Sequence, residues 1–187
     1  WVIGAEPAFQ LAAVATMPTG MQEMAVAGGL MGTPLEMVKC TTSDILVPAN
    51  AEIIIEGLVD PSERDTEGPF GENLGFMAGV SEKPVARITA ITHRKDPIYY
   101  GMSSQMPPSE STFLQSNSTA GLISKILRHD LGETQITDLH VDQTFGGQMA
   151  HGIIAMTPLY PGHAMKVGRM AAEVSAFKRV TVVDDDV

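Results

Sequence analysis

The residues best suited to chemistry form a short run, EGPFGE, at positions 67–72. Glu67 and Glu72 bracket two glycines and a proline. Glycine permits backbone conformations that other residues resist, and proline fixes one dihedral angle. A tight turn of this kind could aim both carboxylates at one point, where one acid can stay protonated and deliver a proton near neutral pH. The alternative is an acidic turn that is simply solvated.

The other reactive side chains carry weaker signals. The five histidines, at positions 93, 129, 140, 151 and 163, lack metal-ligand spacing, and we expect each to be structural or exposed. The 12 methionines are expected to fill gaps in the core. Cys40 lies in a strand-like pattern and is expected to be an inert buried thiol. A single cysteine forms no internal disulfide, which favours a reducing, cytoplasmic setting.

Short helices and closely spaced strands must position the EGPFGE run. Helices are predicted over 6–14 and 22–30, and Glu23 at the start of the second would suit the positive end of the helix dipole. The strands predicted before position 103 cover 35–40, 45–48, 52–59, 85–92 and 97–102. The chain between them is too short for crossover helices, so we expect antiparallel pairing and an antiparallel barrel or sandwich.

The remaining chain predicts a mixed α and β segment. Ser109 should cap a helix whose apolar positions include Leu114 and Leu122, closed by Gly132. Strands over 137–142, 152–156 and 179–183 follow, with a glycine-bearing loop at 145–148 and a helix after Pro161.

Composition excludes several classes of function. The chain has 187 residues, 12 Lys and Arg against 22 Asp and Glu, and a formal net charge of −10. Because affinity for nucleic acid or an anionic membrane surface comes from clustered Lys and Arg, neither partner is expected. No apolar run approaches the roughly 18 residues that a membrane span needs. The 44% of hydrophobic residues can build one core.

Several motifs occur in one order along the chain. They are LEMVKC at 35–40, VPA at 47–49, AEIIIEG at 51–57, EGPFGE at 67–72 and ITHR at 91–94 with DPI at 96–98. This order resembles the UbiD family of decarboxylases, which use prenylated FMN. The resemblance is strongest over 17–102 and weaker from Gly132 onward. It implies an α+β fold built on an antiparallel split β-barrel of the flavin-reductase type, with flanking helices.

The resemblance also implies a reaction and its residues. In that family the modified flavin reacts covalently with an aromatic or α,β-unsaturated carboxylic acid, CO2 leaves, and a glutamic acid protonates the remaining carbon. By position, Glu72 matches the proton donor, and Glu67 matches the glutamate that holds a Glu-Arg-Glu network together. The substrate could also be an aryl-CoA thioester with a free carboxylate. Arg64 lies nearest the motif, but its position does not match the network arginine.

Cofactor-binding residues are implied in the same way. Glu23 matches the carboxylate that ligates a divalent metal, Mn2+ or Mg2+, which bridges to the flavin phosphate, with K+ nearby. Hard cations prefer carboxylate and phosphate oxygens, which supports this role. Thr16 and Met17 align with the segment that lines K+ and flavin, although the chain is about two residues shorter after Met17 than is usual in the family.

Family members are more than twice as long as this chain, and they form oligomers. We therefore expect residues 1–187 to be the central part of such an enzyme, inactive alone, with its N-terminal and C-terminal parts absent. A subunit of a split enzyme is one alternative. Another is a non-catalytic flavin-binding or assembly subunit on the same barrel, although Glu67 and Glu72 would then have no purpose.

Overall fold

The structure is a computed structural model that describes residues 1–15, 17, 19–144 and 151–185. Thr16 and the predicted glycine-bearing loop at 145–148 lie outside these residues. The chain divides into two compact units. The first comprises Trp1–Ala13, Thr19–Phe70 and Met77–Met102, and the second comprises Val14–Pro18, Gly71–Phe76 and Ser103–Val187. Each unit is described by itself.

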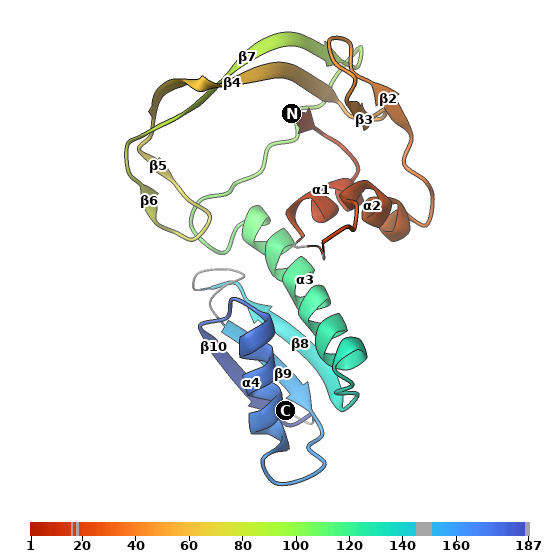
Figure 1. Cartoon of the computed structure of the whole chain (residues 1–187), viewed down its shortest axis with the longest axis vertical. Helices are drawn as coiled ribbons and strands as arrows, with labels where there is room; N and C mark the ends of the chain where they lie inside the picture. The colour runs from red at the N-terminus through yellow and green to blue at the C-terminus, as the bar shows by residue number, and fades with distance from the viewer. Residues whose placement is uncertain (16, 18, 145–150, 186–187) are drawn as a thin grey trace. The chain divides into compact units, whose positions relative to one another are not determined.

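The first unit is built around a long antiparallel pair of strands, β4 and β7, drawn as the curved ribbon in Figure 1. A short strand, β1, pairs with the start of β4, and β2 pairs with β3 in a separate antiparallel hairpin. The elements here are β1 (Val2–Ile3), α1 (Pro7–Val14), α2 (Glu23–Met31), β2 (Met37–Lys39), β3 (Leu46–Pro48), β4 (Ile53–Glu67) and β7 (Ser81–His93).

The second unit is a three-stranded sheet, in the order β10-β9-β8, with α3 packed against β8 and α4 against β10 (Figure 1). β8 and β9 are antiparallel, whereas β9 and β10 are parallel. Its elements are α3 (Glu110–Lys125), the π-helical turn η1 (Ile126–Asp130), β8 (Ile136–Asp142), β9 (His151–Met156), α4 (His163–Val174) and β10 (Arg179–Val183).

The apolar core of the second unit lies on one face of this sheet. Burial alternates along β8 and β9, as expected for strands with one face against helices and one in solvent. Both helices contribute to the same cluster. Its buried members include Ile123, Leu127, Ile136, Leu139, Val141, Ile154, Met156, Val167, Ala171 and Phe177.

Most predicted elements are present, and the antiparallel pairing of the first unit is confirmed. The strands of the described residues form four separate sheets, the fourth being β5 (Phe70–Gly71) with β6 (Met77–Ala78), and none of the four closes into a barrel. The structure therefore supports an α+β fold, and the split barrel stays a prediction.

The predicted strand over 97–102 is wrong, because that segment has no regular structure. The N–H of Ile98 donates to the Glu52 carboxylate at 3.0 Å instead of to a neighbouring strand. Pro97 has no N–H to offer, so the start of the segment cannot complete a ladder. Its β-branched and aromatic residues gave a strand-like pattern, but their exposed side chains bury no face.

Candidate functional site

Glu67 is the last residue of β4, in the first unit, where it pairs with Ser81 of β7. Gly68 follows it with a φ of 94°. A Cβ at Gly68 would lie 2.9 Å from the carbonyl oxygen of Gly79, so this position requires glycine for both its conformation and its space. The Glu67 side chain is exposed, and no described residue pairs with its carboxylate.

Glu72 lies in the second unit, at the first position of a tight turn. Its N–H donates to the carbonyl of Phe76 at 2.8 Å, and its own carbonyl accepts from the N–H of Gly75 at 3.0 Å. Gly75 has a φ of 87°, which closes the turn. The backbone of Glu72 is therefore fixed on both sides, while its exposed carboxylate has no partner within the described part of the chain.

The EGPFGE run thus differs in part from the predicted turn. Only Gly68 uses the left-handed region, and Gly71 does not. A Cβ at Gly71 would lie 2.7 Å from the amide carbon of Gln105, which is the far end of a flexible side chain and can shift. Glu67 and Glu72 belong to different units, so their convergence on one point stays a prediction.

The residues predicted to bind the cofactor also lie in different units. Met17 is half-buried in the second unit, the unit that holds Glu72. Glu23 is the first residue of α2 in the first unit, exposed and without a described partner. Its N-cap, Gln22, makes no side-chain capping bond, so the Glu23 charge is the acidic group at this helix terminus. The described residues contain no cluster of three His, Cys, Asp or Glu that could hold a metal ion.

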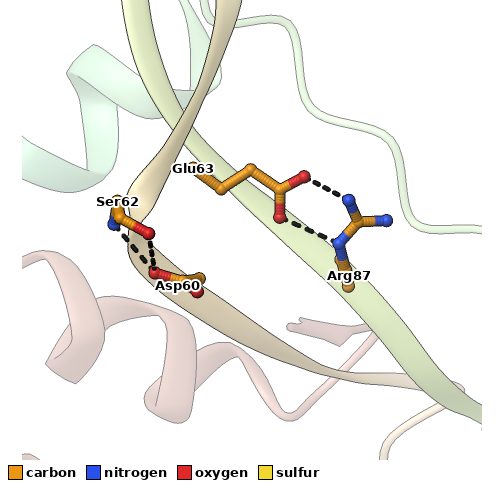
Figure 2. A network of polar contacts seen from close by, with 4 residues as sticks. All are labelled: Asp60, Ser62, Glu63 and Arg87. Carbon is orange, nitrogen blue, oxygen red and sulfur yellow. Dashed lines mark hydrogen bonds and ion pairs between the residues drawn. The ribbon is translucent and has the colours of Figure 1, made fainter.

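A bulge in β4 lies just before the EGPFGE run. Residues 60–63 face Val85 alone, because Val59 pairs with Ala86 and Arg64 pairs with Pro84. Figure 2 shows how polar contacts hold this bulge. The Asp60 carboxylate accepts from the backbone N–H of Ser62 at 2.8 Å and from its hydroxyl at 2.6 Å.

Arg87, on the strand opposite this bulge, is already paired. The Arg87 guanidinium donates through two nitrogens to both carboxylate oxygens of Glu63, with Nε to Oε2 at 2.8 Å (Figure 2). These hydrogen bonds raise the pKa of Arg87. Arg64, in contrast, is exposed and has no partner among the residues that the structure describes.

Two carboxylates of the AEIIIEG motif, for which the sequence predicts no role, anchor loops in the first unit. Glu56 is 7% exposed and accepts from the backbone N–H groups of Thr41 and Thr42 at 2.7 Å each, and from the Thr42 hydroxyl at 2.6 Å. The Thr42 hydroxyl, with both N–H groups, lowers the pKa of Glu56. Glu52 similarly accepts from Ile98 and from Arg94 at 2.9 Å. The sequence signal for such an anchoring role is a charged residue within an otherwise apolar predicted strand.

A second buried carboxylate, Glu133, lies in the second unit. It is 6% exposed and accepts from His163 Nε2 at 2.7 Å and from Lys166 Nζ at 2.6 Å. The Nδ1 atom of His163 accepts from the N–H of Leu159 at 3.2 Å, and the ring stacks on Tyr160. His163 is therefore structural, as expected. The hydrogen bond from Lys166, followed by that from His163, lowers the pKa of Glu133.

Cys40 differs from its expected environment. It directly follows β2, is half-buried, and lines a cavity of about 200 Å³ together with Thr92 and His93.

No helix in the described part of the chain has the length and apolar character needed to cross a membrane.

Comparison with known proteins places this geometry in a family. A family model described as "3-octaprenyl-4-hydroxybenzoate carboxy-lyase Rift-related domain" (UbiD) matches residues 1–107. An uncharacterized protein from Archaeoglobus fulgidus is 39% identical over 188 residues, which cover 99% of this chain and 38% of that protein.

Two solved structures resemble the whole chain. An evolved dimeric form of the UbiD-class enzyme HmfF from Pelotomaculum thermopropionicum, in complex with prenylated FMN, is 34% identical with a TM-score of 0.90. Vanillic acid decarboxylase of Sedimentibacter hydroxybenzoicus, in its open form, is 27% identical with a TM-score of 0.88. Each match covers 100% of this chain but only 42% and 40% of those chains, respectively. The chain belongs to the UbiD family.

Proposed function

We propose that this chain supplies the cofactor-binding and catalytic region of a prenylated-FMN-dependent carboxy-lyase. The substrate would be an aromatic or α,β-unsaturated carboxylic acid, or an aryl-CoA thioester with a free carboxylate, decarboxylated reversibly. Family membership and the likeness to HmfF with bound prenylated FMN support this proposal. The observation that carries it is the state of Glu72, an exposed carboxylate that pairs with no described residue, on a turn whose backbone is fixed, in the unit that holds Met17.

Glu72 is suited to proton donation. A general acid must come within hydrogen-bond reach of the group that it protonates. No described residue forms an ion pair with Glu72, whereas Glu63 is paired with Arg87 and Glu133 with Lys166. Glu67, five residues earlier, would hold the network that orients Glu72 through an arginine. Other domains of the complete enzyme would supply that arginine, because Arg87 is paired with Glu63 and the position of Arg64 does not match the network arginine.

The cofactor site would use Thr16, Met17 and Glu23. Prenylated FMN, when bound, would supply the electron sink for loss of CO2. The exposed Glu23 carboxylate fits a hard cation, Mn2+ or Mg2+, because such ions often take one or two protein carboxylates and complete their shell with phosphate oxygens and water. One ligand makes a weak site, so the metal and the nearby K+ would need further groups from the complete enzyme.

The split barrel would be completed by chain beyond these 187 residues. Large apolar side chains on β4 and β7 are exposed in the first unit, including Leu58, Val59, Ile88 and Ile91, as expected for strands that need a covering layer. The complete protein would be a cytoplasmic homo-oligomer built from this and further domains, and the chain alone would be inactive.

The test is Glu72→Gln in the complete enzyme, with Glu82→Gln as a matched control. Glu82 is an exposed carboxylate on β7 with no role in this proposal. Loss of the general acid should lower the decarboxylation rate by about 10²–10⁴-fold, while flavin absorbance stays with the protein after desalting. Glu82→Gln should match the parent. Full turnover by Glu72→Gln would remove the proton-donor role, and flavin retention without any turnover by the parent would indicate a non-catalytic flavin-binding subunit.

A further inference from the structure

The turn that presents Glu72 is tied to α3 by one side-chain hydrogen bond. Asn73 Nδ2 donates to Gln115 Oε1 at 2.8 Å, and the bond is partly buried. The two residues are 42 positions apart in the sequence, and both lie in the second unit.

Packing on both sides of Glu72 supports the same attachment. The Gln105 side chain lies over Gly71, which is the residue before Glu72. Pro107 and Met106 lie against Gly75, where a Cβ would come within 3.1 Å of the proline Cδ. The segment that leads into α3 therefore covers both ends of the turn, and α3 itself holds the middle through Asn73.

We propose that Asn73 and Gln115 are positioning residues for Glu72, an inference that rests on the proposed role of Glu72 as proton donor. The backbone bonds of the turn fix its internal shape but not its orientation relative to α3. The Asn73–Gln115 bond supplies that constraint, because it joins the residue next to Glu72 to a rigid helix. A displacement of about 1 Å at a reacting group can cost on the order of 10²-fold in rate, so one such constraint has a measurable effect.

The Asn73–Gln115 bond acts on Glu72 indirectly, so the expected kinetic signature is specific. Either substitution should lower kcat and leave KM nearly unchanged, since neither residue is proposed to touch the substrate. The pH profile for kcat should also change, because a reoriented Glu72 meets different surroundings. A residue needed only for folding would change the yield of active enzyme without moving the pH profile.

The experiment is a double-mutant cycle in the complete enzyme, with Asn73→Ala, Gln115→Ala and the double variant. Each single variant should lower kcat about tenfold, and the double variant should be no slower than either one, because both remove the same bond. Asn117→Ala is the control, since Asn117 is an amide on α3 whose side chain donates to Phe113 instead. Its kcat should equal that of the parent. Unchanged kcat in Gln115→Ala, or additive losses in the double variant, would overturn the inference.

Two further measurements separate this inference from the proposed function. In the Glu72→Gln background, Gln115→Ala should cause no additional loss of kcat, and a further tenfold loss would contradict positioning through Glu72. In the 187-residue chain, hydrogen exchange at Gly75 N–H should accelerate in Gln115→Ala but not in Asn117→Ala. Unaltered exchange would also overturn the inference, whatever the activity. If Glu72→Gln is slow and Gln115→Ala is not, the proposed function stands and this inference fails.

Discussion

At the scale of single residues, environment divides the carboxylates of this chain into two groups. Glu56 and Glu133 are buried and fully engaged, and their hydrogen bonds lower their pKa values. Glu67 and Glu72 are exposed and unpaired within the described residues. A buried, bonded carboxylate holds a structure together, whereas an unpaired one is free to exchange a proton.

Glu133 gives a prediction on stability. Glu133→Gln removes the charge that accepts hydrogen bonds from His163 and Lys166, and it should lower the free energy of unfolding by about 2 kcal/mol at pH 7. Urea denaturation measures this change. The control is Glu173→Gln, an exposed position on the same helix as His163, which should have little effect. An equal loss in both variants would contradict a specific role of the buried cluster.

The same carboxylate sets a dependence on pH. The pKa of Glu133 is lowered from 4.5 in the folded chain, so its stabilising contribution is present above about that pH. It is lost as pH falls through the folded value, where Glu133 takes up a proton. The difference in unfolding free energy between the parent and Glu133→Gln should therefore shrink as pH falls below 4.5. A difference that stays constant down to pH 3 would show that charge is not its origin.

These partnerships could not be read from the sequence. Glu133 meets residues 30 and 33 positions away, and Glu56 meets residues 14 and 15 positions away across a hairpin. The sequence predicts roles for Glu67 and Glu72 because they belong to a local motif, and for Glu23 by its position in the family resemblance, and these roles stay predictions. Nothing local distinguishes Asn73 or Gln115, whose contact depends on how a turn docks on a helix.

At the scale of elements, local sequence signals predicted which helices and strands exist better than they predicted the length of each one. Hydrophobic periodicity and capping residues predict the helices α1, α2, α3 and α4 and most of the strands. β4 extends eight residues beyond its predicted end at Val59, because polar residues continue the exposed ribbon and a bulge interrupts its register. The alternation of apolar and polar residues ends where the strand is no longer buried, so this pattern cannot detect the exposed half of a hairpin.

The cap of α3 is a testable case at this scale. The Ser109 hydroxyl accepts from the N–H of Thr112, and the Thr112 hydroxyl accepts from the N–H of Ser109 at 2.8 Å, forming a capping box. Ser109→Ala should lower the free energy of unfolding by about 1 kcal/mol, as measured by urea denaturation. Ser118→Ala is the control, because that hydroxyl only bonds within the helix, to Leu114. A loss no greater than that of the control would contradict the cap.

At the scale of the whole molecule, the two units differ in how complete their cores are. The second unit has a contiguous cluster that includes ten buried residues, whereas the described residues of the first unit bury few apolar side chains, Ala12, Ala27, Ala51 and Ile54 among them. The chain spans about 38% of the relative from Archaeoglobus fulgidus and 42% of HmfF. The exposed apolar side chains of the first unit support the proposal that further chain covers it in the complete protein.

Strand spacing predicts only an antiparallel barrel or sandwich, and the split barrel comes from the resemblance; neither determines whether the sheet closes. Closure depends on which strands meet at the free edges of β4 and β7, and these contacts are not local. The pairing direction within the hairpins, in contrast, follows from short connections and is confirmed.

The central claim is that Glu72 transfers the proton at the carbon that loses CO2. The most direct test is exchange of hydrogen between D2O and the decarboxylated product, followed by NMR in the complete enzyme. By microscopic reversibility the acid of the forward reaction is the base of this exchange, so parent and Glu82→Gln should exchange at equal rates. Glu72→Gln should be slower by about 10²-fold or more with flavin retained. Exchange at the parent rate in Glu72→Gln would contradict the account.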